Sequence, residues 1–429
     1  MNTENSVSDL LSFLDKSPTA SWAVSGLASK LEENDFRRLH EKDIWNLSIN
    51  EKFYIVRSSS AIIAGISGSQ SCGEAGCRIT GAHTDSPGFR VKPIPQRSKD
   101  GMITLGVEVY GSPILATWFD RDLSISGTLV FQEDNLLKQK LFILRKPVCR
   151  IASPAIHLER NINKDGFKIN PEDNTPLLLS TSGSGFQELL DLACNSAGLR
   201  KEDVSGWSME VWDPQPAVTG GIDDDFIFSG RLDNLTMCHA AVEAILRTEE
   251  TPHTRMISLF NSEEVGSKTL NGANSSFLDS VIERLSGSRK EYFRCLSNSV
   301  FVSADGAHGV HPNYAGKHDS ECRPVLNGGP VIKVNASNKY TSSDISSSYF
   351  SHCAKEAGVN VQYYVSRNDI LCGSTIGPIT SSRTGIKSVD VGNAMLSMHS
   401  IREVAGTSDH EDMIKVFVEH MMGTVSISD

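Results

Sequence analysis

The chain has 429 residues, a formal net charge of −11 and a hydrophobic content of 39%. This length is sufficient for two domains with substantial cores, and the composition is that of a globular protein. The acidic balance argues against nucleic acid or an anionic membrane as the main partner. No uninterrupted apolar run is long enough to span a bilayer, and the first residues lack the pattern of a signal peptide. We therefore expect a soluble, cytoplasmic protein with no nucleic-acid or membrane partner.

The nine cysteines are an odd number scattered along the whole chain. Such a distribution is typical of free thiols in a reducing compartment. Cys72 and Cys77 form the only close pair in the sequence. Two thiols alone do not make a structural zinc site, so we expect no metal at this pair.

The first part of the chain predicts alternating helices and strands. Apolar residues at helical spacing indicate helices at residues 6–15 and 20–31. Runs of β-prone residues indicate strands at 53–57, 61–64 and 77–82. The last of these strands runs directly into His83, and Asp85 follows two residues later.

The pattern changes between residues 89 and 218. Short β-rich runs separated by turn residues occur at 103–110, 126–131 and 141–144, and helical spacing appears only at 185–197. We predict an inserted β-rich domain (89–218) that interrupts a catalytic domain formed by residues 1–88 and 219–429. Two features of the insert stand out, the charges beside aromatic residues at 118–122 and His157 in an apolar run. Taken alone, each favours a core or interface group over a catalytic one.

After residue 220 the alternation of strands and helices resumes and predicts an α/β fold. Strands are expected at 226–232, 256–260, 300–304, 330–334, 361–365 and 386–391, with helices at about 235–245, 342–357 and 411–422. The run at 256–260 is typical of a buried strand in a parallel sheet.

The strand at 256–260 leads into two adjacent carboxylates, Glu263 and Glu264. Carboxylates do not lie in dry interiors unless a positive group meets them. For an isolated pair, an exposed acidic loop is the favoured explanation. Adjacent side chains also point in different directions, so one can ligate a cation while the other handles a proton.

Ligand-capable residues follow several of the predicted strands. Together with Glu263 and Glu264, the set consists of His83, Asp233, Asp305 and His399. Sites in open α/β sheets form beyond the carboxyl ends of the strands. Two histidines, two terminal carboxylates and one bridging carboxylate suit a pair of zinc-like cations that share a water, and the remaining carboxylate is then the general base. The Asp85 carboxylate can accept the other ring N–H of His83 and fix its tautomer.

Longer motifs around these residues resemble the aspartyl aminopeptidase family of di-zinc exopeptidases, and the similarity extends over nearly the whole chain. The motifs are Gly81–Pro87, Trp118–Leu123, Arg231–Leu235, Glu263–Ser267, His311–Tyr314 and Met398–Glu403. The resemblance implies a zinc-peptidase-like α/β sandwich catalytic domain, interrupted by a β-rich domain that mediates dimerisation. It also implies a homo-oligomer built from dimers, since related enzymes assemble as dodecamers around an internal chamber.

The resemblance further implies a role for each site residue and two zinc ions per subunit. Asp233 would bridge the two ions, His83 and Asp305 would complete one zinc site, and Glu264 and His399 would complete the other. Glu263 would be the catalytic base and Asp85 the residue that orients His83. His157 would reach into the site of a neighbouring subunit and stabilise the oxyanion.

For the substrate, the resemblance implies peptides with Asp or Glu at the N-terminus, and His308, Lys333 and Tyr340 would surround the acidic side chain. A buried lysine on an apolar strand needs a partner, which a substrate carboxylate would supply, but a solvent-facing lysine at alternate strand positions explains Lys333 equally well. Other functions remain open: an aminopeptidase that prefers neutral N-terminal residues, a di-metal deacylase or amidohydrolase, and a non-catalytic oligomeric scaffold.

Overall fold

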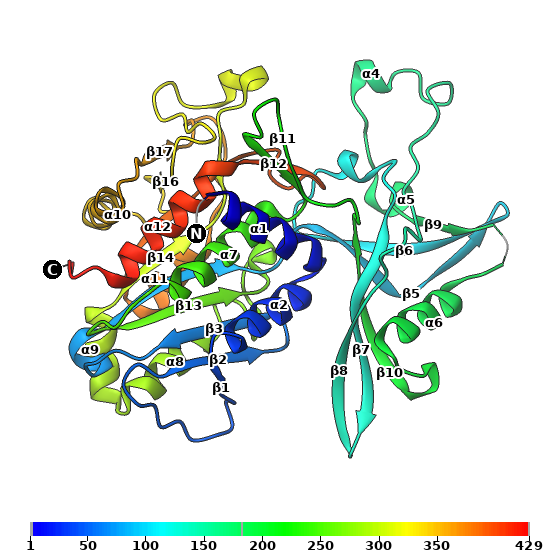
Figure 1. The fold of residues 1–429 in the computed structure, drawn as a ribbon. Coiled ribbons are helices and arrows are strands. Elements are labelled where there is room, and N and C mark those ends of the chain that lie inside the picture. The colour runs from blue at the N-terminus through cyan, green and yellow to red at the C-terminus, as the bar shows by residue number, and fades with distance from the viewer. Residues whose placement is uncertain (1–2, 182, 428–429) are drawn as a thin grey trace.

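The computed structural model describes residues 3–181 and 183–427 and has two lobes (Figure 1). The two ends of the chain share the larger lobe, and the middle of the chain forms the smaller one. Within the described residues, the larger lobe contains a nine-stranded sheet with the order β1 (Arg37–Arg38), β2 (Lys52–Arg57), β3 (Ala61–Ile66), β13 (Thr254–Phe260), β4 (Cys77–His83), β14 (Val300–Ala304), β18 (Lys387–Gly392), β16 (Val331–Val334) and β17 (Gln362–Val365).

The centre of this sheet is parallel, which places several strand ends at one edge. β4 pairs in parallel with β13 on one side and with β14 on the other, and β14 pairs in parallel with β18. The flanking strands β3 and β16 run antiparallel to β13 and β18. The prediction of a buried strand at 256–260 is confirmed, since every residue of β13 is buried. Phe260 at its end is in register with His83.

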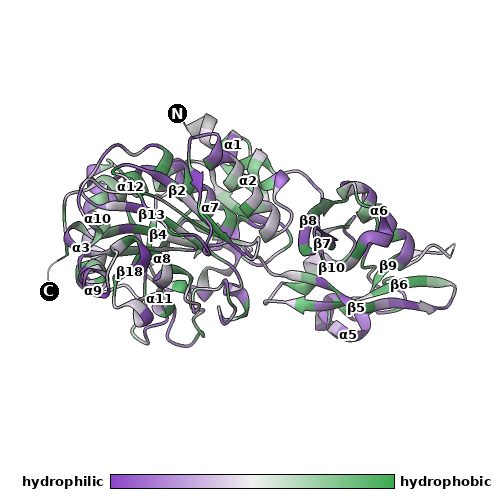
Figure 2. Cartoon of the chain, turned by 90° about the horizontal axis from the view of Figure 1, so that it is seen from below, coloured by the Kyte–Doolittle hydropathy of each residue, from purple (hydrophilic) through white to green (hydrophobic). Residues whose placement is uncertain are grey.

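Helices cover both faces of the large sheet and give an α/β sandwich of three layers. One face packs against α2 (Ala20–Glu32), α7 (Leu232–Leu246), α10 (Asp344–Glu356) and α12 (Thr407–Met422), with α1 (Thr3–Lys16) outside them. The other face packs against α3 (Cys72–Ala75), α8 (Phe277–Ser286), α9 (Arg289–Asn298) and α11 (Ile376–Thr384). Side chains alternate between the layers, since Ile257 and Leu259 join the first core and Met256 joins the second. Figure 2 shows the apolar residues concentrated on these central elements.

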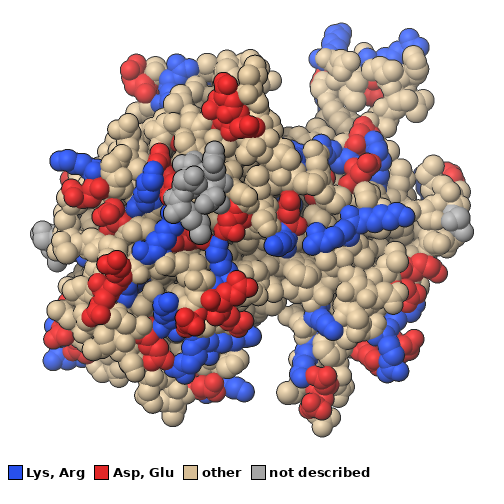
Figure 3. Space-filling model, viewed as in Figure 1, with Lys and Arg blue, Asp and Glu red and all other residues tan. Residues whose placement is uncertain are grey.

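The smaller lobe is an antiparallel sheet, formed by strands between Gly88 and Trp212. In the part of the chain described here it has six strands in the order β8 (Leu136–Ile143), β7 (Ser124–Glu133), β10 (Val204–Trp212), β5 (Gly88–Lys99), β6 (Met102–Tyr110) and β9 (Leu177–Ser180). α6 (Phe186–Ala197) packs against this sheet and closes a separate apolar core, and the short helices α4 (Ile162–Asp165) and α5 (Pro171–Asn174) lie on the connections. Over both lobes, basic and acidic side chains are interspersed on the face drawn in Figure 3.

A third, small sheet joins the larger lobe to the site described below. Among the residues described, it has five strands in the order β11 (Val218–Gly220), β12 (Phe226–Ser229), β20 (Glu403–Gly406), β19 (Ala394–Leu396) and β15 (Ala307–His308). β12 leads into α7, and a turn connects β19 to β20. The sequence predicted β12 but neither β19 nor β20. The predicted α/β fold class is confirmed, and no helix within residues 3–181 and 183–427 has both the length and the apolar character needed to traverse a bilayer.

The pKa values of two buried histidines determine how the stability of this fold depends on pH. The His253 Nε2 lies 2.7 Å from the Met421 carbonyl oxygen, and the His420 Nε2 lies 3.2 Å from that of Ile79. Burial lowers the pKa of His253 from 6.5 to about 4 and that of His420 to about 3. The unfolded chain therefore binds more protons than the folded chain below pH 6.5, and stability falls on acidification through this window by up to about 1.4 kcal/mol per pH unit and histidine.

We expect the free energy of unfolding, measured with urea at pH 7 and pH 5, to drop less in His253→Gln than in the unmodified chain. The matched control is His352→Gln, because the His352 side chain is exposed. An equal drop in all three proteins would show that His253 does not carry the effect.

Candidate active site

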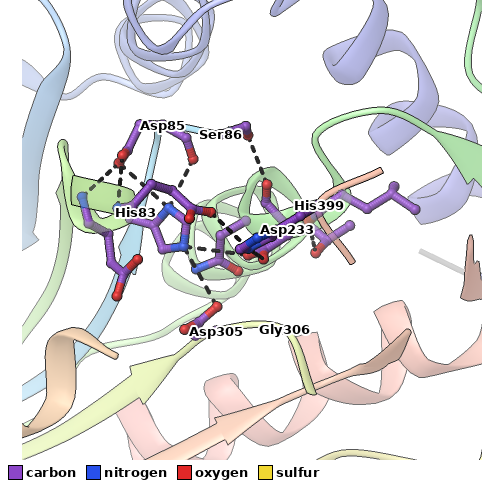
Figure 4. Close-up of polar contacts among 12 residues, drawn as sticks. His83, Asp85, Ser86, Asp233, Asp305, Gly306 and His399 are labelled. Atoms are coloured by element: carbon purple, nitrogen blue, oxygen red, sulfur yellow. Dashed lines mark hydrogen bonds and ion pairs between the residues drawn. The ribbon is translucent and has the colours of Figure 1, made fainter. Parts of the chain in front are cut away.

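The predicted ligands come together at the carboxyl edge of the large sheet (Figure 4). His83 ends β4, the short 3-10 turn Glu263–Val265 follows β13, and Asp305 follows β14. The small sheet supplies the other two ligands, because Asp233 lies at the start of α7 and His399 lies in the turn between β19 and β20. Five segments that are far apart in the sequence thus meet in one place.

The side chains form two groups that share Asp233. The His83 Nε2 lies 3.4 Å from the Asp233 Oδ1 and 3.6 Å from the Asp305 Oδ1. The His399 Nε2 lies 3.4 Å from the Asp233 Oδ2 and 3.3 Å from the Glu264 Oε1. Each oxygen of Asp233 therefore faces a different histidine. In each group of three, the candidate ligand atoms lie within 4.8 Å of one another.

These separations fit shared cations better than direct hydrogen bonds. Nitrogen and oxygen atoms in a good hydrogen bond are about 2.7–3.2 Å apart. Two ligands at about 2.0–2.2 Å from one tetrahedral zinc ion are about 3.3–3.6 Å apart. The buried Asp233 Oδ1 accepts no hydrogen bond from any described residue. Imidazole nitrogens and carboxylate oxygens are also the ligands that zinc takes in catalytic sites, so the residues present fit a pair of zinc ions.

The electrostatics of the bare side chains show how strongly the site favours positive charge. Although burial opposes it, the carboxylates of Asp233 and Glu264 raise the pKa of His399 to about 11. Burial also opposes a charged His83, yet Asp233, Asp305 and Asp85 raise its pKa. Without cations, the protonated histidines are the partners of these buried carboxylates. Bound cations would take over this role and leave the rings neutral.

Glu263 has the properties of a proton acceptor beside these two groups. Its side chain is half-buried, and burial raises its pKa from 4.5 to about 8. One of its carboxylate oxygens lies within 4.8 Å of ligand atoms of His83 and Glu264. A carboxylate whose pKa is near neutrality takes up and releases protons readily at physiological pH.

Asp85 contacts His83 through its backbone carbonyl oxygen and not, as predicted, through its carboxylate. The His83 Nδ1 lies 2.9 Å from the backbone carbonyl oxygen of Asp85 and 3.6 Å from its carboxylate. The carboxylate instead accepts hydrogen bonds from the backbone N–H groups of Glu263 and Glu264 (3.1 and 3.2 Å) and from the Tyr110 hydroxyl (2.7 Å). Asp85 thus orients His83 through its backbone, while its carboxylate fixes the turn that carries the two glutamates.

Sequence reasoning missed three supporting groups. The Tyr110 hydroxyl holds Asp85, the Ser112 carbonyl oxygen lies 3.0 Å from the His399 Nδ1, and the buried Glu403 carboxylate accepts N–H bonds from His399 (2.8 Å) and Asp233 (3.1 Å). Burial raises the pKa of Glu403. The one signal in the sequence was Glu403 itself, a carboxylate at the end of the Met398–Glu403 motif. Tyr110 and Ser112 lie in the predicted insert and carried no signal.

The ligand-bearing turns contain residues in the left-handed region of backbone space. Arg231, Ser262 and His399 have φ values of 61°, 64° and 67°. Non-glycine residues rarely adopt this conformation, and each such residue costs about 1–3 kcal/mol unless its surroundings enforce it. Three of them in the turns around one site indicate that the packing fixes the positions of the candidate ligands.

The residues predicted to select the substrate lie beside Asp305. Lys333 is only 2% exposed, so the alternative of a solvent-facing lysine is wrong. Its Nζ donates to the Gly306 carbonyl oxygen (3.1 Å) and lies 3.7 Å from the Asp305 Oδ2 and 5.1 Å from the centre of the Tyr340 ring. The exposed His308 lines an open pocket together with Met395 and Met398.

The two conspicuous features of the predicted insert behave differently from each other. Trp118 and Phe119 are buried in the core of the smaller lobe, as expected for core groups. His157 lies in an exposed turn, and the neighbouring Leu158 is 82% exposed. Of the expected core or interface position, the core position is therefore excluded for His157, and the interface position stays a prediction. Within the described part of this single chain, no ion pair joins His157 to the ligands.

The chain is similar to a known family of peptidases over nearly its whole length. The sequence profile of the family described as Aminopeptidase I zinc metalloprotease (M18) matches residues 13–420. A protein named "Probable M18 family aminopeptidase 2" from Pseudomonas aeruginosa (strain UCBPP-PA14) is 42% identical over 412 residues, which cover 95% of this chain and 96% of that protein.

Solved structures show the same fold. Ape4 in its complex with Nbr1 superposes with a TM-score of 0.93 at 35% identity and covers 97% of this chain and 85% of that chain. The mApe1 dodecamer of S. cerevisiae superposes with a TM-score of 0.86 at 29% identity and covers 97% of this chain and 96% of that chain. The family match spans nearly the whole chain, including both groups of candidate ligands, and the chain therefore belongs to the aminopeptidase I (M18) family of zinc metalloproteases.

Proposed function

We propose that this M18 aminopeptidase uses two zinc ions per subunit to release N-terminal residues, preferably Asp or Glu, from peptides. The observation that carries the proposal is the pair of ligand groups that share Asp233, with each of its oxygens facing a different histidine. Family membership supports a zinc-dependent aminopeptidase. The number of ions, the ligand roles and the acidic preference are our proposal.

His83, Asp233 and Asp305 would hold one zinc, and Asp233, Glu264 and His399 the other. Zinc held by these residues would supply Lewis acidity, by which the scissile carbonyl would be polarised and a nearby water made more acidic. Asp85 keeps the Glu263 carboxylate in place through the hydrogen bond to its backbone N–H. Glu263 removes a proton from the attacking water and then delivers it to the leaving amine.

The proposed function is tested by a metal assay combined with a panel of substrates. We expect two zinc ions at the candidate active site of each chain and chelator-sensitive cleavage of peptides that begin with Glu or Asp. Faster cleavage of Leu-peptides would favour the neutral preference, and turnover of acylated amino acids instead of peptides would favour a deacylase. A chain without bound metal and without chelator-sensitive hydrolysis would be a scaffold.

Lys333→Ala is expected to lower kcat/KM for Glu- and Asp-peptides about tenfold or more, and for Leu-peptides much less. The physical reason is that a buried ammonium needs a negative partner. If Asp305 binds a metal ion, the substrate carboxylate can fill that role beside Tyr340. The steady-state rates of a peptide pair that differs only in the first residue provide the measurement.

The control for this substitution is Lys339→Ala, because Lys339 is exposed on the following segment. An equal loss on acidic and neutral peptides in Lys333→Ala would show that Lys333 supports Asp305 and does not select the substrate.

We also propose that the insert (89–218) forms the dimer contact of a dodecamer and that His157 completes the site of a neighbouring subunit, where it would steady the oxyanion. The exposed apolar side chains of Ile94 and Leu158 on the smaller lobe support an interface, as does the dodecameric mApe1 relative. All nine cysteines, each of which lies in the described part of the chain, are free, which supports a reducing cytoplasmic location.

A further inference from the structure

Three buried cysteines meet in the larger lobe, away from the site described above. Cys72 begins α3, Cys77 begins β4, and Cys295 lies in α9. Their sulfur atoms all lie within 4.8 Å of one another. His83 is at the opposite end of β4, and a strand rises about 3.3 Å per residue, so the thiols lie about 20 Å from the catalytic ligands. The sequence showed only the pair Cys72 and Cys77, and the fold adds the third thiol from 218 residues further along the chain.

We propose that Cys72, Cys77 and Cys295 form a second metal site, which binds one soft divalent cation such as zinc through three sulfur atoms. The Cys77 and Cys295 Sγ atoms are 3.6 Å apart. This separation is far longer than a disulfide bond of about 2.05 Å. Two sulfurs that each lie about 2.3 Å from one ion are about 3.8–4.0 Å apart, which is close to the observed separation.

The surrounding backbone holds the three thiols together without help from the sulfurs. The chain from Cys72 to Cys77 forms the short helix α3 and then turns at Gly76, whose φ is 72°. A Cβ at Gly76 would lie 2.2 Å from the Asn298 carbonyl oxygen, so this turn packs directly against the end of α9. The Asn298 Nδ2 also donates to the carbonyl oxygens of Gly73 and Glu74 (3.0 and 3.2 Å). These contacts bring Cys295 to the pair and keep it there.

The charge of the site favours a divalent ion over a monovalent one. Three thiolates leave a net charge of −1 around a divalent ion and −2 around a monovalent ion, and the site lies in an apolar core where charge is costly. Two hydroxyl groups lie beside the sulfurs. The Thr254 Oγ1 is 3.3 Å from the Cys72 Sγ, and the Ser299 Oγ is 3.7 Å from the Cys295 Sγ. Soft thiolate ligands select zinc and related ions over hard cations such as magnesium or calcium.

Cobalt(II) distinguishes this site from the catalytic one, because thiolate ligands give an intense charge-transfer absorption and nitrogen and oxygen ligands do not. We expect the full chain, stripped of metal and titrated with cobalt(II), to show this absorption with a saturation of one sulfur-bound ion per chain. Cys77→Ser and Cys295→Ser should each lower its amplitude at least tenfold. The matched control is Cys194→Ser, a buried cysteine of α6 in the smaller lobe, which should leave the band unchanged.

X-ray absorption of the unmodified zinc-loaded chain provides a measurement that does not depend on the folding of variants. Sulfur scatterers at the usual zinc–thiolate distance are expected in addition to the nitrogen and oxygen scatterers of the catalytic ions. The proposal is overturned if the unmodified chain shows neither the absorption band nor sulfur scatterers, since the three thiols then only pack as small apolar groups. A Cys77–Cys295 disulfide in the isolated protein, detected by mass spectrometry, would also overturn it. None of these measurements depends on peptidase activity.

Discussion

Glu263→Gln is expected to lower kcat at least about a hundredfold while leaving the metal content of the chain nearly intact. The amide has almost the same shape as the carboxylate and keeps the backbone hydrogen bond of this residue to Asp85, but it cannot accept a proton. Glu263 is absent from both groups that share Asp233, so its loss removes no ligand from either of them. The measurement combines steady-state kinetics with metal analysis of the same preparation.

The control for this variant is Glu356→Gln, an exposed glutamate at the end of α10. Loss of metal from Glu263→Gln would contradict its assignment as the base, because it would show that Glu263 is itself a ligand. Full activity would mean that another group handles the proton.

Asp233→Ala is expected to release both zinc ions and to abolish hydrolysis. Asp233 is the one described carboxylate that belongs to both three-ligand groups, so its removal leaves each group with two protein ligands. The substitution also leaves His83 and His399 without their closest shared partner. Metal analysis after dialysis, together with peptide turnover, provides the measurement.

The informative comparison is Asp305→Ala, because Asp305 belongs to the His83 group but not to the His399 group. This variant should keep close to one zinc ion at the catalytic site, in the group of Asp233, Glu264 and His399. Two tightly bound ions at the catalytic site of Asp233→Ala would refute the bridging role, and equal metal loss in both variants would show that the two groups do not bind independently.

The α/β fold and the gathering of the candidate ligands could be predicted because short stretches of the sequence show clear patterns for both. Strands such as β4 and β13 are short, apolar and β-prone, and a ligand-capable residue at the end of each stands out against them. Parallel pairing then brings the strand ends to one edge, which follows from general rules for such sheets. The sequence could therefore indicate that His83, Glu264 and Asp305 meet.

Several of the missed elements, among them α9, α11, β19 and β20, have weaker signals of this kind. α9 is mostly polar and has only a short apolar stripe of Tyr292, Cys295 and Leu296. α11 begins in a Gly-rich segment with a proline at its third residue and shows no clear apolar stripe. β19 and β20 are only three and four residues long and are held by pairing within the small sheet. Helices and strands of this kind form because tertiary contacts override weak local preference.

The supporting groups of the site depended on the same long-range contacts. Tyr110 is 25 residues from Asp85, and Ser112 is 287 residues from His399. Both belong to a stretch that reads as an ordinary β-rich segment. Contacts between segments so distant in sequence leave no periodic pattern, so only the folded chain could reveal them.

The segment that leaves β6 has a consequence for how the two lobes can evolve or be engineered. Tyr110 and Ser112 come from this segment, and the backbone N–H of Ile114 also donates to the carbonyl oxygen of His399. Excising the smaller lobe to obtain a minimal hydrolase would take away the phenol that secures Asp85 and the carbonyl that secures a histidine ring. A truncated enzyme would keep the candidate ligands but lose the contacts that align them. Peptide cleavage therefore depends on retaining the smaller lobe.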